Sequence, residues 1–157
     1  MAFKVQCQKA KNWCWAAVAA SVGAISVPLR ESRQFKLVEN EIAGATNCDL
    51  DPGSSVCNQS FYLDVALQDL PRSIDTKGPI PLEKIKSELA AKPEIPICVK
   101  IDWKGGGAHY VAIADVTATD MLVIEDPQNG HKIPCSYTKL KTHYSKRGTW
   151  SETYLLL

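Results

Sequence analysis

The chain lacks the features that mark membrane-spanning, repetitive or nucleic-acid-binding proteins. No apolar run reaches the roughly 18 residues that a membrane span needs, and there is no internal repeat or low-complexity segment. The formal net charge is only +1 and the basic residues form no block, so we expect no nucleic-acid partner. The length of 157 residues predicts one domain, covering 1–157, and we expect it to be a monomer.

The sequence also lacks any Cys-x-x-Cys pair, although it contains six cysteines: Cys7, Cys14, Cys48, Cys57, Cys98 and Cys135. Neither a zinc ribbon nor a thioredoxin-type redox motif is indicated, and we expect no metal and no cofactor. Cys48 and Cys57 lie in one loop and could be bridged. Free thiols in a reducing compartment fit the spacing equally well, so both alternatives stay open.

One pattern near the N-terminus resembles a secretory signal peptide. Lys4, Lys9 and Lys11 precede an apolar stretch over 13–27. Signal cores are usually richer in Leu than in Trp and Cys, so we expect this stretch to belong to the folded protein. The sequence leaves open whether the protein is cytoplasmic or secreted.

The hydrophobic periodicity changes near Pro93. Before it, three- and four-residue spacing predicts helices at 13–24, 31–45, 59–70 and 81–91, with a break at Pro28, a loop over 46–58 and a connector over 71–81. After it, β-branched runs predict strands at 95–103, 109–116, 121–126, 131–136 and 149–157, with a short helix at 137–144. Helices fill the 1–93 half and strands the 94–157 half, which predicts an α+β fold.

The most unusual stretch places Cys14 between two tryptophans at the start of a helix. Asn12 is a good N-cap residue, so Cys14 is expected in the first turn. The unpaired N–H groups and the helix dipole there favour a thiolate, which is a nucleophile. Gln8 could return its side-chain amide to the thiol and donate to an oxyanion. The alternative is a buried structural cysteine, a common role for this residue type.

A second group of chemically active residues lies in the β half. His109 opens one predicted strand and Asp126 closes the next. If these strands form a hairpin with a two-residue loop at 117–118, His109 faces Asp126 at about 5 Å between Cβ atoms. A register slip by two residues keeps both side chains on one face, whereas a slip by one does not. Asp115 is the rival partner, while His131 and His143 are expected in solvent.

These stretches resemble the papain-like cysteine peptidases. Gln8 followed six residues later by Cys14, within Asn-Trp-Cys-Trp-Ala-Ala, is similar to their nucleophile region. The run from Ile97 through the three glycines to Ile113 is similar to their histidine strand, and Glu-Asp-Pro at 125–127 to the strand of their third catalytic member. The similarity is to compact bacterial forms, which include effector proteases of plant pathogens and bacteriocin-leader peptidases. It implies a helical N-terminal half packed against a C-terminal antiparallel β-sheet or half-barrel.

The resemblance also implies roles for particular residues. Cys14 would be the nucleophile, His109 the general base and acid, Asp126 the orienting residue and Gln8 the oxyanion donor. Residues expected to contact substrate are Trp13, Trp15, Gly106 and Gly107, the glycines by letting a substrate backbone approach. A simple flexible turn is the other interpretation of these glycines.

The expected function is hydrolysis of a peptide bond in a peptide or protein substrate. The same thioester chemistry could serve a deamidase or a transglutaminase, because the attack on the carbonyl does not fix the acceptor. A binding module that kept the fold without catalysis is the alternative from a different class.

Overall fold

The computed structural model describes residues 3–26 and 33–157. Its elements, in chain order, are α1 (Cys14–Gly23), α2 (Gln34–Glu41), α3 (Leu63–Gln68), β1 (Ile74–Lys77), α4 (Leu82–Ala91), β2 (Ile97–Trp103), β3 (Ala108–Val116), β4 (Leu122–Asp126), β5 (His131–Cys135), α5 (Tyr137–His143) and β6 (Gly148–Leu156). The predicted α+β class is confirmed. The predicted break at Pro28 and helix start at Glu31 lie outside the described residues.

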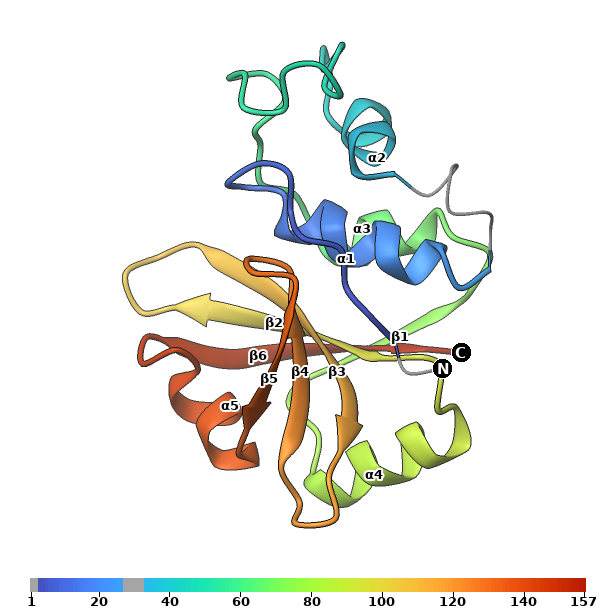
Figure 1. Cartoon of the computed structure of the whole chain (residues 1–157), viewed down its shortest axis with the longest axis vertical. Coiled ribbons are helices and arrows are strands. Elements are labelled where there is room, and N and C mark those ends of the chain that lie inside the picture. Colours follow the sequence, from blue (N-terminus) through green and yellow to red (C-terminus); the bar gives the residue numbers. More distant parts are fainter. Residues whose placement is uncertain (1–2, 27–32) are drawn as a thin grey trace.

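The strands form one open antiparallel sheet in the order β1-β6-β2-β3-β4-β5. Figure 1 shows α1, α2 and α3 on one side of this sheet and α4 and α5 on the other. No helix in the described ranges has both the length and the apolar character needed to cross a bilayer.

Alternation along the strands divides the interior into two cores, because successive side chains of a strand point to opposite faces. Tyr110 and Ala112 of β3 pack toward α1 and α3, within the first core. Val111 and Ile113 of the same strand belong to the second core, which α4 and α5 cover. β3, the strand after the glycines, is therefore buried on both faces, and this packing fixes the start of the strand in place.

The helical half differs from the sequence-based prediction in three places. α2 ends at Glu41 rather than at residue 45, and Gly44, with φ +81°, lies in the turn that follows. α3 spans only Leu63–Gln68, because the carbonyl of Gln59 is held by a side chain of α1 instead of starting a helix. The predicted connector over 71–81 contains β1, a short strand that pairs with β6.

Candidate active site

Cys14 is the first residue of α1, where the helix has N–H groups without intrahelical partners. Its predicted place in the first turn is confirmed. The prediction of Asn12 as the N-cap is wrong, since Trp13 holds that position and no side chain caps the helix. Asn12 instead donates from Nδ2 to the Asn58 carbonyl oxygen (3.1 Å), and its backbone N–H donates to Asn58 Oδ1 (2.8 Å).

Both tryptophans beside Cys14 tie α1 to the same stretch of chain, at residues 57–59. The indole N–H of Trp13 donates to the carbonyl oxygen of Cys57 (2.7 Å), and that of Trp15 donates to the carbonyl oxygen of Gln59 (2.9 Å). Both rings are buried. Trp15 lines a small cavity next to Cys14, whereas Trp13 lines neither cavity that contains Cys14. The geometry thus gives the two rings a role in positioning Cys14, and contact with substrate stays a prediction.

The segment that receives these bonds is closed by a disulfide between Cys48 and Cys57. Of the two alternatives that the sequence left open, the bridged one is present. Cys14 is one of four free thiols, with Cys7, Cys98 and Cys135. Burial raises the pKa of Cys98 to about 12 and also raises the pKa of Cys135, which makes these two thiols weak nucleophiles.

His109 and Asp126 are in contact, with 2.8 Å between His109 Nε2 and Asp126 Oδ1. The predicted register of this hairpin is wrong: Ala112 pairs with Glu125 and Ile113 with Ile124, a shift of two residues. The loop is longer than two residues, since the Thr117 N–H reaches the carbonyl oxygen of residue 121 (2.8 Å). A shift of two keeps both side chains on one face, which is why the contact survives.

Asp126 is held by three donors. Besides His109, the Tyr144 hydroxyl donates to Oδ2 (2.7 Å) and the Gln128 backbone N–H donates to Oδ1 (2.9 Å). Burial opposes the charge of this carboxylate, but the bonds from His109, Tyr144 and Gln128 outweigh it and hold the pKa of Asp126 below its usual value. Asp126 is therefore an ionised, fixed partner for the imidazole at neutral pH.

The His109 ring is buried and stacked on Trp103, with 5.5 Å between ring centroids. Burial works against the charged imidazole, but hydrogen bonds to Asp126 and Cys14 outweigh it and raise the pKa of His109 to about 9. At neutral pH the ring is thus an imidazolium beside the Cys14 sulfur. Because Nε2 engages the carboxylate, Nδ1 is the nitrogen left to exchange a proton with the thiol.

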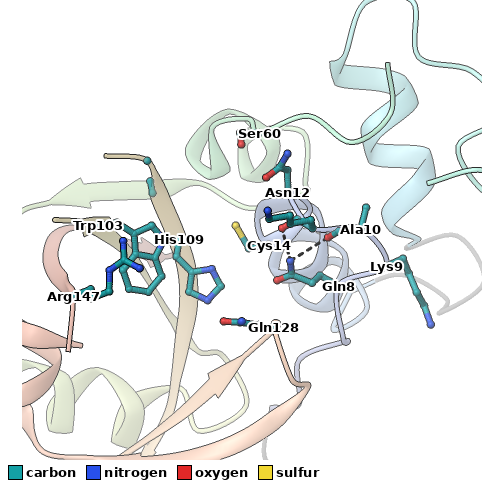
Figure 2. A pocket seen from close by; sticks show the side chains of 13 residues that line it. Gln8, Lys9, Ala10, Asn12, Cys14, Ser60, Trp103, His109, Gln128 and Arg147 are labelled. Carbon is teal, nitrogen blue, oxygen red and sulfur yellow. Dashed lines mark hydrogen bonds between the residues drawn. The ribbon is translucent and has the colours of Figure 1, made fainter. Parts of the chain in front are cut away.

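Cys14 and His109 share an open cleft of about 780 Å³. Figure 2 shows the sulfur facing the imidazole across this cleft, with Gln8 on the helical side and Gln128 and Trp103 on the side of the sheet. A second cavity of about 240 Å³ meets the first at Cys14 and is lined by the aromatic rings of Phe61, Tyr62 and Tyr110. The sulfur of Cys14 therefore lies where two cavities meet and not in a closed core.

Gln8 lines the cleft, but its amide is already engaged. Its Nε2 donates to the carbonyl oxygens of Ala10 (3.0 Å) and Lys11 (2.7 Å), and its buried Oε1 has no partner. Both amide hydrogens are used to shape the turn that leads to Trp13. In this conformation Gln8 can donate to an oxyanion only by releasing one of the two carbonyls.

The remaining predicted residues divide between the cleft and the surface. Gly107 lines both cavities at Cys14, while Gly106 lines neither. Asp115, the rival partner of His109, is exposed and accepts from the Val116 N–H (2.8 Å). His131 and His143 are exposed, as predicted. Across residues 3–26 and 33–157, no three His, Cys, Asp or Glu side chains gather in a way that could hold a metal ion.

Sequence reasoning missed two residues that complete the site. Tyr144 follows α5 and reaches Asp126 from 18 positions further along the chain, which no local pattern predicts. Trp103 ends β2 and stacks on His109, and its place just before the three glycines was the one available signal.

Comparison with protein-family models finds no match, and no curated protein matches the chain with significant similarity.

Proposed function

We propose that the protein is a thiol-dependent hydrolase of peptide bonds, with a compact papain-like arrangement of Cys14, His109 and Asp126. The observation that carries this proposal is the pairing of His109 with Asp126 at 2.8 Å, with the imidazole next to a cysteine at a helix N-terminus. A nucleophile, a base and an orienting group in one open cleft are the parts that acyl transfer through a thioester requires.

The proposed reaction has two steps. The Cys14 thiolate attacks the carbonyl carbon, and His109 gives its proton to the leaving amine as the C–N bond breaks, leaving a thioester on sulfur. His109 then takes a proton from water, whose oxygen attacks the thioester and releases the carboxylic acid and the free thiol. The backbone N–H of Cys14 would stabilise the oxyanion in both steps, joined by Gln8 if its amide turns from the Ala10 or Lys11 carbonyl.

The test is digestion of a proteome-derived peptide library, with products identified by mass spectrometry. Wild type and Cys7→Ser should create new amino termini, since Cys7 is an exposed thiol that does not line the cleft. Cys14→Ala and His109→Ala should create none. Asp126→Asn should retain more activity than His109→Ala, because an amide can still orient the ring whereas no neighbour replaces the base.

The same digest separates the alternatives. A mass increase of about 1 Da at glutamine with ammonia release, without chain cleavage, would identify a deamidase, and cross-linked peptides a transglutaminase. Unchanged peptides that nevertheless bind to the wild type would identify a non-catalytic module. Either result would overturn peptide-bond hydrolysis as the function.

A further inference from the structure

The larger cleft at Cys14 carries charge of one sign. Three cationic side chains line it, namely Lys9, Lys11 and Arg147, and none of its described lining residues is Asp or Glu. The chain as a whole is nearly neutral, with 18 Lys and Arg against 17 Asp and Glu. Positive charge is thus concentrated in the larger of the two cavities that meet at Cys14.

None of these three cations is neutralised within the described part of the chain. The ion pairs found there join other residues, among them Lys84 with Glu88 and Lys86 with Asp120. A cation without a carboxylate partner beside a cavity is free to bind an anionic group of a ligand. Because all three line the same cavity, they also add to its local positive potential.

Arg147 is the best placed of the three. Figure 2 shows it beside Trp103 on the sheet side of the cleft, whereas Lys9 extends outward at the helical rim. Its backbone is fixed from two sides, because its N–H donates to the Tyr144 carbonyl (3.2 Å) and its own carbonyl accepts from the Lys104 N–H (2.7 Å). The guanidinium therefore extends from a fixed turn, which begins at Tyr144, the residue whose hydroxyl donates to Asp126.

The direction of a bound substrate follows from the proposed chemistry. His109 must reach the amine that leaves, so the chain beyond the scissile bond lies on the His109 side. His109 lines the larger cavity and is not among the residues that line the smaller one. The basic cavity is therefore the one that faces the amine side of the substrate.

We propose that this cleft selects substrates with a carboxylate within the first few residues after the scissile bond, and that Arg147 binds this carboxylate. The inference rests on the proposed function for its direction. An arginine fork matches a carboxylate in two parallel hydrogen bonds, so an acid is preferred over its neutral amide of equal size. The carboxylate belongs either to an Asp or Glu side chain or to the C-terminus of a substrate cut near its end.

The first experiment uses internally quenched peptides built on a sequence that the wild type cleaves in the library. Each carries Glu, Gln or Lys at one of the first three positions after the cut, with a free or an amidated C-terminus. We expect about tenfold higher kcat/KM for Glu than for Gln, and an equal gain from a free C-terminus would identify the terminal carboxylate as the source. Arg147→Ala should reduce the ratio of Glu to Gln to about one, and Arg147→Glu should favour Lys.

The matched control for Arg147→Glu is Lys36→Glu, which changes the net charge by the same amount. Lys36 is an exposed residue of α2 that does not line the cleft. This variant should keep the wild-type ratio. A wild-type ratio near one, or a ratio that falls equally in Lys36→Glu and Arg147→Glu, would overturn the proposal, because the preference would be absent or would reflect overall charge alone.

A binding arm makes the two proposals fail separately. Dye-labelled hexapeptides of alternating Ala and Glu, Ala and Gln, or Ala and Lys are titrated with Cys14→Ser, and anisotropy reports binding without chemistry. Selective binding of the Glu peptide that Arg147→Ala abolishes, together with a wild type that cleaves no peptide of the library, would support the acidic ligand and refute hydrolysis. Cleavage without any preference for acid would support hydrolysis and refute the role of Arg147.

Discussion

The hydroxyl of Tyr144 offers a sharp test of the site, because Tyr144→Phe removes one atom and leaves the ring in place. That hydroxyl donates to Asp126 Oδ2 at 2.7 Å in a buried setting. A hydrogen bond to a charged group contributes about 1.5–3 kcal/mol, and one pKa unit corresponds to about 1.4 kcal/mol. If the loss falls on the ionised form, the pKa of Asp126 rises by about one to two units.

The consequences differ with pH. The pKa of Asp126 lies below its ordinary value of 3.8, so this carboxylate contributes stability above that value and loses it as the pH falls. In Tyr144→Phe, the free energy of unfolding should fall by about 2 kcal/mol at pH 7, and by less at pH 3, because the carboxylate of the variant becomes protonated at a higher pH than that of the wild type. Asp126 stays ionised at pH 7, so kcat/KM there should drop by less than tenfold, while the acidic limb of its pH profile moves up by about one to two units.

The measurements are urea unfolding at the two pH values and kcat/KM between pH 3 and pH 8 with a peptide from the library. Tyr137→Phe is the matched control, since the Tyr137 hydroxyl donates to a neutral carbonyl, that of Ile80, at 2.9 Å. It should cost about 1 kcal/mol at both pH values and leave the acidic limb in place. An unshifted limb in Tyr144→Phe would refute the assignment of Asp126 as the charged partner of His109.

Three further predictions concern other parts of the molecule. Iodoacetamide should modify Cys14 faster than Cys98 at about pH 6, because burial raises the pKa of Cys98 to about 12; timed alkylation with peptide mapping measures both rates, and equal rates would contradict an activated nucleophile. Replacing both disulfide cysteines by serine, Cys48→Ser with Cys57→Ser, should lower the free energy of unfolding by about 3 kcal/mol, which is the loop-closure value for a loop of this size. Urea titration measures this loss, and a loss near zero would contradict the prediction. Glu41→Gln should stabilise the protein more at pH 8 than at pH 5. Burial and the nearby Asp69 raise the pKa of Glu41 to about 7, so the folded wild type loses stability as the pH rises through that value. Thermal unfolding at both pH values measures the stabilisation, and an equal gain at pH 5 and pH 8 would contradict the prediction.

What the sequence predicts about the site is its local part. The strand pattern within about ten residues predicts His109 at a strand start and Asp126 at a strand end. The helix start at Cys14 was predicted from Asn12 as N-cap, and it holds although the N-cap is Trp13, one residue further on. The two strand placements are determined by hydrophobic patterning, which the chain carries in every segment. The antiparallel sheet follows in the same way, from β-branched runs separated by turn residues.

The parts that could not be predicted depend on partners distant in sequence. The hairpin register shifted for two reasons. The loop is longer than two residues, with Asp120 in a left-handed conformation (φ +63°), and a β-bulge or irregularity changes the pairing between Ile113 and Asp115. β1 is a strand only because β6 supplies its hydrogen bonds. The side-chain amide of Gln8 could face the thiol or the carbonyl oxygens of its own turn. The residue type alone does not decide between these two places, because its N–H groups can donate in either.

Cys14 and His109 lie in different layers of the fold, one in the helices and one in the sheet, and no covalent link nearby sets the distance between them. Cys14 belongs to α1, which the bonds from Trp13 and Trp15 anchor to Cys57, at the end of the disulfide-closed loop, and to Gln59 just beyond it. His109 belongs to β3, whose next residues pack under α1. Because a catalytic pair would tolerate only about 0.5 Å of misplacement, the proposed reaction would depend on the buried indoles for the position of Cys14. The tryptophans on either side of Cys14 are therefore explained by the need to hold the start of α1 against a loop, whereas His109 is held by the sheet.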